Sequence, residues 1–363
     1  MTFSLGVNLP WVRCGHDFGP RPPAWAGAGP TDWAALEGDL KRLRELGVTV
    51  VRMWVLAGGV NVAVGQRTDT LARRVPFLEP WHPHQRRWRR MRGAVPERWA
   101  WRDTPPLPEA FLEDFRTLFE AARAADVRLV PSLLSFEFFF PIRDGASGVP
   151  DQGHAALALR PDFYPRLLEP LLDVAEAHRD TLAAFEVMNE PDWVVRDGHR
   201  GAEHGAHPPW VRPDRMAQFL VDGARRIAAR GLTATIGFAD GAAAWMPPSS
   251  RVALRRLAAS GRYLHQHHHY PRPGATATLP PASESPIRPC WIGEMATSRE
   301  RVWQDPDADE TSPRFLEKRL ALARARGYEG ALLWSRNATD PQTDWGESVQ
   351  AQVRRVAAQM QRE

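Results

Sequence analysis

The sequence predicts an α/β fold, a (β/α)₈ TIM barrel formed by a single domain over residues 1–363. Short β-rich runs alternate along the chain with longer amphipathic stretches, which is typical of parallel strands joined by helices. Several of the short runs, such as VTVVRMWVL and VRLVPSLL, are almost continuously apolar, as expected of strands that are covered on both faces. Eight such runs with helices between them favour a closed barrel over an open sheet.

The expected strands are short and lie at regular intervals along the chain. They cover Phe3–Leu9, Thr49–Val55, Val127–Leu134, Ala183–Asn189, Leu232–Phe238, Tyr263–His269, Cys290–Glu294 and Gly330–Ser335. The first expected helix starts at a cap on Thr31 or Asp32, has its leucines on one stripe and stops at Gly47. Further helices are expected over Glu109–Ala125, Asp162–His178, Pro213–Arg230, Ser250–Ala259, Pro313–Arg326 and Trp345–Met360.

Three connections are too long to be simple turns. They follow the second, fourth and sixth strands and cover roughly Ala57–Pro108, Pro191–Arg212 and Pro271–Pro289. In a barrel these loops lie at the carboxyl ends of the strands, where active sites are built. The first contains RRWRRMR, Arg86–Arg92, which we interpret as a solvated basic loop because no nucleic-acid-binding module accompanies it.

The composition is that of an ordinary globular protein, with 43% hydrophobic and 25% charged residues. A net charge of +4 does not by itself indicate a nucleic-acid partner. No apolar stretch is long enough for a membrane span, and the first residues do not follow the signal-peptide pattern. We therefore expect a cytoplasmic protein without nucleic-acid or membrane partners, with Cys14 and Cys290 as reduced thiols.

The chain has 15 tryptophans but only 4 tyrosines. The flat face of an indole ring packs well against the C–H groups of a sugar. Trp11, Trp54 and Trp193 fall at or after the ends of expected strands, so each is a candidate for contact with a sugar. Packing in the core is the alternative for each of them.

Two short motifs end expected strands on a carboxylate. FEVMNEP ends the fourth strand at Asn189-Glu190, and WIGEM ends the seventh at Glu294. Both side chains should lie at the same open end of the barrel. Glycosidic hydrolysis with retention needs two carboxyl groups about 5–5.5 Å apart, one to attack the anomeric carbon and one to protonate the departing oxygen.

With these motifs the chain resembles the clan of glycoside hydrolases built on (β/α)₈ barrels with catalytic glutamates on strands four and seven. It is most similar to glycoside hydrolase family 5, the cellulase and mannanase family, over Leu5 to about Trp334. The resemblance implies that Glu190 is the acid/base and Glu294 the nucleophile. It also implies that Asn189 hydrogen-bonds the 2-hydroxyl group of the sugar.

Further residues match the pattern of that family. Arg52 in VVRMW matches an arginine that holds the nucleophile ionised. His268 and Tyr270 in HHHYP match a His-x-Tyr pair whose tyrosine typically hydrogen-bonds the nucleophile, and Trp334 in LLWS matches the aromatic floor of the subsite for the cleaved sugar.

The chain departs from the family after the third strand. The family usually carries a histidine there, whereas this chain reads PSLLSFEFFF. Candidates to fill the space are Ser132, Ser135 and Glu137. This departure bears on which sugar the subsite accepts.

We therefore expect a retaining glycoside hydrolase that cleaves a β-mannoside or β-glucoside oligosaccharide by double displacement, without metal or other cofactor. A non-catalytic carbohydrate-binding barrel is one alternative. A metal-dependent hydrolase using the histidines of the sixth strand is another. Alternation places His265, His267 and His269 on one face and His268 on the other. The first strand reads GVNLP and lacks the His-x-His of amidohydrolase-type metal barrels, which disfavours the metal site.

Overall fold

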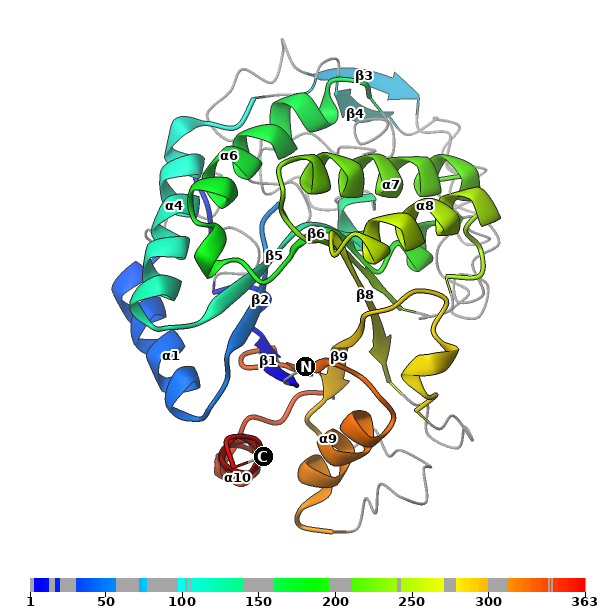
Figure 1. Ribbon diagram of the computed structural model, residues 1–363. Coiled ribbons are helices and arrows are strands. Elements are labelled where there is room, and N and C mark those ends of the chain that lie inside the picture. The colour runs from blue at the N-terminus through cyan, green and yellow to red at the C-terminus, as the bar shows by residue number, and fades with distance from the viewer. Residues whose placement is uncertain are drawn as a thin grey trace, which may run out of the picture.

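The computed structural model describes residues 3–12, 17–19, 31–56, 72–76, 97–101, 104, 106–139, 160–195, 211–239, 243–270, 279–299, 312–338, 340 and 342–362. Within these residues, eight parallel strands close into a barrel in the order β1, β2, β5, β6, β7, β8, β9, β10, with β10 pairing back onto β1 (Figure 1). The prediction of a (β/α)₈ barrel is confirmed.

Each barrel strand overlaps one of the expected runs, and no boundary differs by more than two residues. The strands are β1 Ser4–Asn8, β2 Val50–Trp54, β5 Arg128–Ser135, β6 Phe185–Asn189, β7 Ala234–Phe238, β8 Tyr263–His269, β9 Cys290–Ala296 and β10 Gly330–Trp334.

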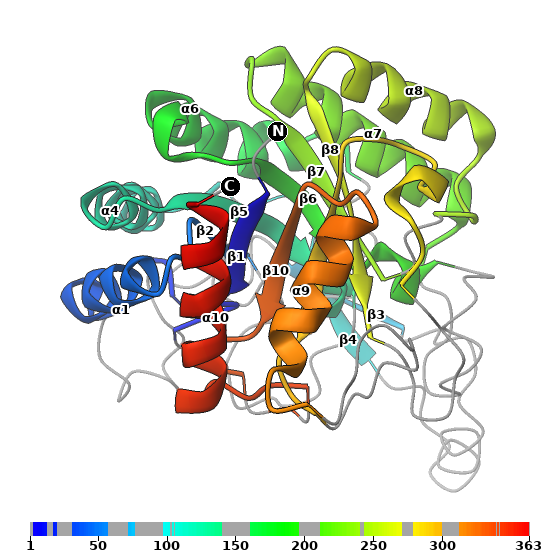
Figure 2. The ribbon, with the colours of Figure 1, turned by 60° about the horizontal axis from the view of Figure 1, so that its bottom comes forward.

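Helices surround the barrel in both ribbon views (Figures 1 and 2). In the described part of the chain they are α1 Trp33–Glu45, α4 Glu109–Ala124, α6 Glu169–Ala177, α7 Pro213–Ala229, α8 Pro248–Ala259, α9 Phe315–Ala325 and α10 Glu347–Met360. None of the helices described is both long and apolar enough to cross a membrane.

The first helix, α1, shows how local sequence determines where a helix begins and ends. Asp32, one of the two expected caps, accepts a hydrogen bond from the backbone nitrogen of Ala35 at 2.9 Å. Gly47 follows the helix with a φ of 89°, a conformation that favours glycine. A Cβ at Gly47 would lie 2.1 Å from the Cβ of Ala357 in α10. This glycine therefore both ends α1 and lets α10 approach.

One expected helix is divided in the structure. The stretch expected over Asp162–His178 begins with a single π-helical segment, Tyr164–Leu168, and continues as α6. Pro170, at the start of α6, has no backbone N–H to donate to the preceding turn. The N–H of Glu169 closes the π turn by donating to the Tyr164 carbonyl.

The structure adds an element that the sequence analysis did not predict. Within the connection after β2, strands β3 Ala72–Pro76 and β4 Glu97–Trp101 form a two-stranded antiparallel sheet. It is separate from the barrel sheet. The basic stretch 86–92, most of the first two long connections and residues 271–278 of the third lie outside the described residues.

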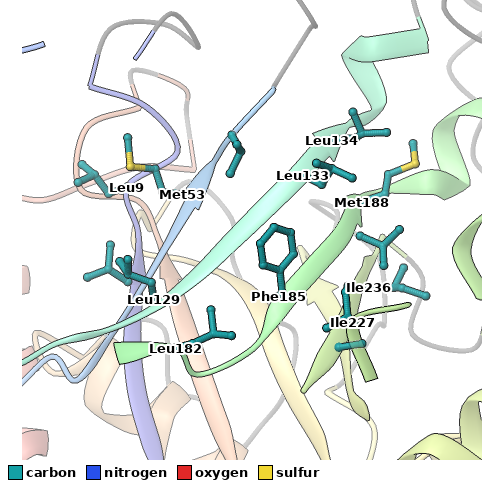
Figure 3. Close-up of a cluster of buried hydrophobic side chains, with 14 of the residues drawn as sticks. Leu9, Met53, Leu129, Leu133, Leu134, Leu182, Phe185, Met188, Ile227 and Ile236 are labelled. Carbon is teal, nitrogen blue, oxygen red and sulfur yellow. The ribbon is translucent and has the colours of Figure 1, made fainter. Parts of the chain in front are cut away.

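The core is built in two layers. The larger layer lies between strands and helices, and Figure 3 shows part of it, including Leu129 of β5, Phe185 of β6 and Ile227 of α7. The smaller cluster consists of buried residues on or next to the barrel strands: Val50, Val130, Ala184, Leu264, Trp291 and Leu332.

Polar residues follow this small apolar cluster at a spacing of two residues, so they lie on the same face of each strand one layer higher. The pairs, apolar then polar, are Val50 and Arg52, Val130 and Ser132, Ala184 and Glu186, and Leu264 and Gln266. The barrel interior therefore changes from apolar to polar toward the carboxyl ends of its strands.

Candidate active site

Arg52 stands at the centre of this polar layer and is fully buried. Its Nε and Nη2 donate to the two carboxylate oxygens of Glu186 at 2.8 and 2.7 Å. Nη1 donates to Asn8 Oδ1 and to Glu294 Oε1, each at 2.8 Å. Nη2 also donates to Asn189 Oδ1 at 2.7 Å. The five N–H donors of the guanidinium group are thereby all engaged, which fixes its orientation.

Two glycines make room for this cluster. A Cβ at Gly237 of β7 would lie 2.9 Å from both Arg52 Nη2 and His268 Nε2. A Cβ at Gly293 of β9 would lie 2.3 Å from Gln266 Oε1. Strand glycines often mark such close approaches, and here they let large polar side chains fill the barrel.

The two candidate catalytic glutamates lie close together beside one histidine. His268 Nδ1 is 2.8 Å from Glu190 Oε1 and 3.4 Å from Glu294 Oε2. One carboxylate oxygen of each glutamate and a ring nitrogen of His268 all lie within 4.8 Å of one another. The Tyr270 hydroxyl donates to Glu294 Oε2 at 2.7 Å. The side chain of Glu190 is 13% exposed and that of Glu294 only 5%.

Neighbouring groups shift the pKa of Glu294, the candidate nucleophile, in opposite directions. Burial raises the pKa of Glu294 above its ordinary value, and the neighbouring Glu190 adds to the rise. His268, Arg52 and the Tyr270 hydroxyl act in the opposite direction without reversing it. Burial alone would lower the pKa of Arg52, but Glu186 and Glu294 outweigh burial and raise it. Arg52 thus remains a cation and favours the ionised form of Glu294.

The backbone of Glu190 has an uncommon conformation. Its φ and ψ are 46° and 56°, in the left-handed region that residues other than glycine rarely adopt. Its N–H donates to the Gly237 carbonyl at 2.6 Å, and Trp193 Nε1 donates to its Oε2 at 2.8 Å. Such conformations cost of order 1–3 kcal/mol and cluster at functional sites. Here the conformation directs the carboxylate toward His268.

Three tryptophans pack together at the carboxyl ends of β1, β2 and β10. The Trp54 ring centroid lies 6.1 Å from that of Trp11 and 5.5 Å from that of Trp334, both in edge-on geometry. The Cζ atom of Arg52 lies 4.6 Å from the Trp54 centroid. Trp54 is only 3% exposed, whereas Trp11 and Trp334 are half-buried. Trp334 and Trp11 therefore have more ring surface available to a ligand than Trp54.

The structure brings most of the predicted site residues into one network. Glu190, Glu294, Arg52, Asn189, His268 and Tyr270 are connected by the contacts above. Trp193 joins through its indole nitrogen, and its predicted contact with a sugar stays a prediction. The contacts of Trp11, Trp54 and Trp334 with a sugar also stay predictions.

Three residues of the network were not predicted to belong to the site. Asn8 accepts from Arg52, and Gln266 Nε2 donates to Glu186 Oε2 at 2.6 Å. Glu186 is the bidentate partner of Arg52. For Glu186 and Gln266 the available signal was the spacing of two residues after the buried apolar residues Ala184 and Leu264; Asn8 follows Gly6 at the same spacing.

Two of the three candidates for the place of the family's histidine, Ser132 and Ser135, lie on β5 and contact the network. Ser132 Oγ donates to Glu186 Oε1 at 2.6 Å, and Ser135 Oγ accepts from Asn189 Nδ2 at 3.3 Å. The side chain of Glu137, the other candidate, lies outside the described residues. The two serines therefore support Glu186 and Asn189 from β5.

The histidines of β8 divide between two environments. His265 lies against the Phe238 ring, and His267 lies near Cys290 and Tyr328. His268 joins the two glutamates. Burial raises the pKa of the Cys290 thiol to about 12, so it stays protonated. Cys14 lies outside the described residues.

Within the described ranges, Glu190, His268 and Glu294 form the one group whose ligand atoms are spaced as a metal site would require. The Arg52 guanidinium already contacts Glu294 at 2.8 Å, and the Tyr270 hydroxyl occupies its other oxygen. The Arg52 cation and the hydrogen bond from Tyr270 at the same carboxylate oppose the binding of a metal ion.

Comparison with solved structures finds the same architecture in glycosidases. A β-mannanase from the blue mussel Mytilus edulis superposes with a TM-score of 0.64 at 17% identity, over 97% of this chain and 91% of the mannanase. A β-1,4-D-mannanase from Cryptopygus antarcticus gives 0.63 at 17% identity, over 97% and 90%. A β-glucosidase from Pyrococcus furiosus gives 0.53 at 12% identity, over 99% and 95%.

No protein-family profile matches the sequence, and no curated protein matches it. At sequence identities of 12–17%, the similarity to these structures establishes only the fold of the chain.

Proposed function

We propose that the chain is a retaining β-glycoside hydrolase, with Glu190 as acid/base and Glu294 as nucleophile. The observation that carries the proposal is the proximity of the two carboxylates, whose oxygens approach within 4.8 Å. Retaining enzymes hold their carboxyl groups about 5–5.5 Å apart, whereas inverting enzymes separate them by about 6.5–9.5 Å to admit a water molecule. The short spacing favours direct attack by a carboxylate.

The reaction takes two steps. In the first, the Glu294 carboxylate attacks the anomeric carbon while the proton of Glu190 passes to the departing glycosidic oxygen. One C–O bond forms and one breaks. In the second, water attacks the same carbon, gives a proton to Glu190 and releases Glu294 as a carboxylate.

The surrounding residues support this assignment of roles. Arg52 and the Tyr270 hydroxyl each bind a different oxygen of Glu294 and orient it for attack. Asn189 is held by Arg52 and Ser135, beside the acid/base, where it can reach a sugar hydroxyl. Trp334, half-buried at the end of β10, offers an aromatic surface for the apolar face of the ring.

The substrate that we propose is an oligosaccharide with β-mannosidic or β-glucosidic linkages. The similar structures are described as mannanases and a β-glucosidase. The layer of tryptophans and acceptor side chains around Arg52 suits a neutral sugar, which is bound by ring stacking and hydroxyl hydrogen bonds.

The test is turnover of aryl β-mannosides and aryl β-glucosides by the wild type, Glu190→Ala and Glu294→Ala. We expect wild-type turnover with the β-anomer as first product, measured by NMR. Azide should restore part of the activity of Glu294→Ala and yield an α-glycosyl azide. With Glu190→Ala, azide should yield the β-glycosyl azide.

Other outcomes lead to different conclusions. Wild-type rates in both alanine variants would remove these glutamates from the mechanism. Tight binding of mannan or glucan oligomers without any turnover would favour a carbohydrate-binding barrel.

A further inference from the structure

Glu186 accepts four hydrogen bonds at the bottom of the site. Arg52 Nε and Nη2 donate to its two oxygens at 2.8 and 2.7 Å. Ser132 Oγ and Gln266 Nε2 each add a donor at 2.6 Å. A carboxyl group surrounded by four donors acts as an acceptor on both oxygens, which is the behaviour of the ionised form.

The proposed reaction changes the number of negative charges that surround the Arg52 guanidinium. The resting site holds one buried guanidinium between two carboxylates, Glu186 and Glu294. When the sugar bonds to Glu294, that carboxylate becomes a neutral ester. The side chain of Arg52 has no exposure to water, and a buried cation without a counter-charge is strongly destabilised.

We infer that Glu186 is a positioning residue that orients Arg52 and remains its counter-charge while Glu294 carries the sugar. This inference rests on the function proposed above. In the resting enzyme the two carboxylates and one guanidinium leave a net negative charge, which favours attack by Glu294. After the attack, Arg52 and Glu186 form a neutral pair. The return of Glu294 to a carboxylate in the second step restores the first arrangement.

Loss of the Glu186 charge should therefore affect the two steps in opposite directions. Without it, Arg52 binds Glu294 as its only carboxylate partner, which stabilises the free nucleophile and makes it less reactive. The same stabilisation makes Glu294 a better leaving group in the second step. A general loosening of the site would slow both steps together.

The experiment measures each step separately in the wild type and in Glu186→Gln. The probes are 2,4-dinitrophenyl 2-deoxy-2-fluoro-β-D-mannoside and the matching glucoside, which form a slowly hydrolysed ester with the nucleophile. The rate constant of inactivation reports the first step. The rate constant of reactivation after removal of the probe reports the second.

We expect Glu186→Gln to slow inactivation by about tenfold or more and to leave reactivation equal or faster. Val187→Ala is the matched control, because Val187 is the next residue of β6 but points away from the site toward Gly223 of α7. It should destabilise the protein while the ratio of the two rate constants remains that of the wild type.

A second variant keeps the test decisive if Glu186→Gln does not fold. Ser132→Ala removes one neutral donor to Glu186, which leaves the Glu186 charge less compensated, so it should shift the ratio by about two- to threefold in the opposite direction. An unchanged ratio in the variant that folds, or equal slowing of both steps, would overturn the inference. A wild-type protein that is neither inactivated by the probes nor active on aryl glycosides would instead overturn the proposed function.

Discussion

Trp193 donates its indole N–H to Oε2 of Glu190 at 2.8 Å, although the two residues are only three positions apart. The short 3₁₀ segment Pro191–Val194 folds the chain back after Glu190 and makes this contact possible. The indole therefore holds one oxygen of the candidate acid/base while His268 contacts the other. Trp193, a candidate from the sequence for contact with a sugar, thus contacts the candidate acid/base.

Replacing Trp193 with Phe should shift the alkaline limb of the kcat/KM profile. A hydrogen bond to a carboxylate favours its ionised form, so its removal lets Glu190 keep its proton to higher pH. We expect the limb to move to higher pH. Trp33→Phe is the control, because it removes a similar bond to Asp114 at 3.0 Å, outside the network around Arg52. An unchanged profile with a large rise in KM would indicate sugar stacking instead.

Tyr270→Phe should shift the acid limb of the same profile. The Tyr270 hydroxyl lowers the pKa of Glu294, which burial has already raised. Without the hydroxyl, this pKa rises further, and the nucleophile becomes ionised only at higher pH. We expect the acid limb to move upward and kcat/KM to fall by about 10–100-fold. A profile that keeps its acid limb would show that another group controls it.

Much of the fold and the positions of the two carboxylates could be predicted because they depend on local pattern. Nearly continuous apolar runs indicated the strands, and a carboxylate at the end of a parallel strand must face the barrel mouth. The partners of Arg52 depend instead on how strands are aligned around the barrel. Register shifts between Glu186 and Asn189 and between His267 and His268 change that alignment, and no period in the sequence reveals them.

The β3–β4 sheet was missed for a different reason. Its strands read ARRVP and ERWAW, with charged residues and a proline where an apolar alternation would be expected. Glu186, which was not predicted as a site residue, lies in β6, four residues before the acid/base. That depth is what places it level with Arg52.

Gly237→Ala should destabilise the protein and reduce activity together. The added Cβ would lie 2.9 Å from Arg52 Nη2 and from His268 Nε2, which must move to accommodate it. Overpacking of this kind typically costs about 1–3 kcal/mol. Gly38→Ala in α1 is the control, since its Cβ would meet no atom closer than 3.6 Å and alanine favours a helix. Urea denaturation and aryl glycoside turnover measure both effects, and a fully active, equally stable Gly237→Ala would contradict the close packing described.

Asp192 should make the stability of the protein depend on pH. It is 3% exposed, and burial raises its pKa from 3.8 to about 7, with a further contribution from Glu190. Hydrogen bonds from Trp245 Nε1 and the Ala239 N–H favour the ionised form but do not offset burial. Between these two pH values the folded state holds a proton that the unfolded chain has lost.

The sign of the effect follows from proton binding. Because the folded state binds more protons over this range, the free energy of unfolding falls as pH rises, by at most about 1.4 kcal/mol per pH unit from this group. Asp192→Asn cannot titrate and lacks this contribution. The stability of Asp192→Asn relative to the wild type should therefore increase between pH 4 and pH 7 and then level off. Urea denaturation of both proteins at each pH measures the difference, and a constant difference over that range would show that Asp192 is ionised throughout.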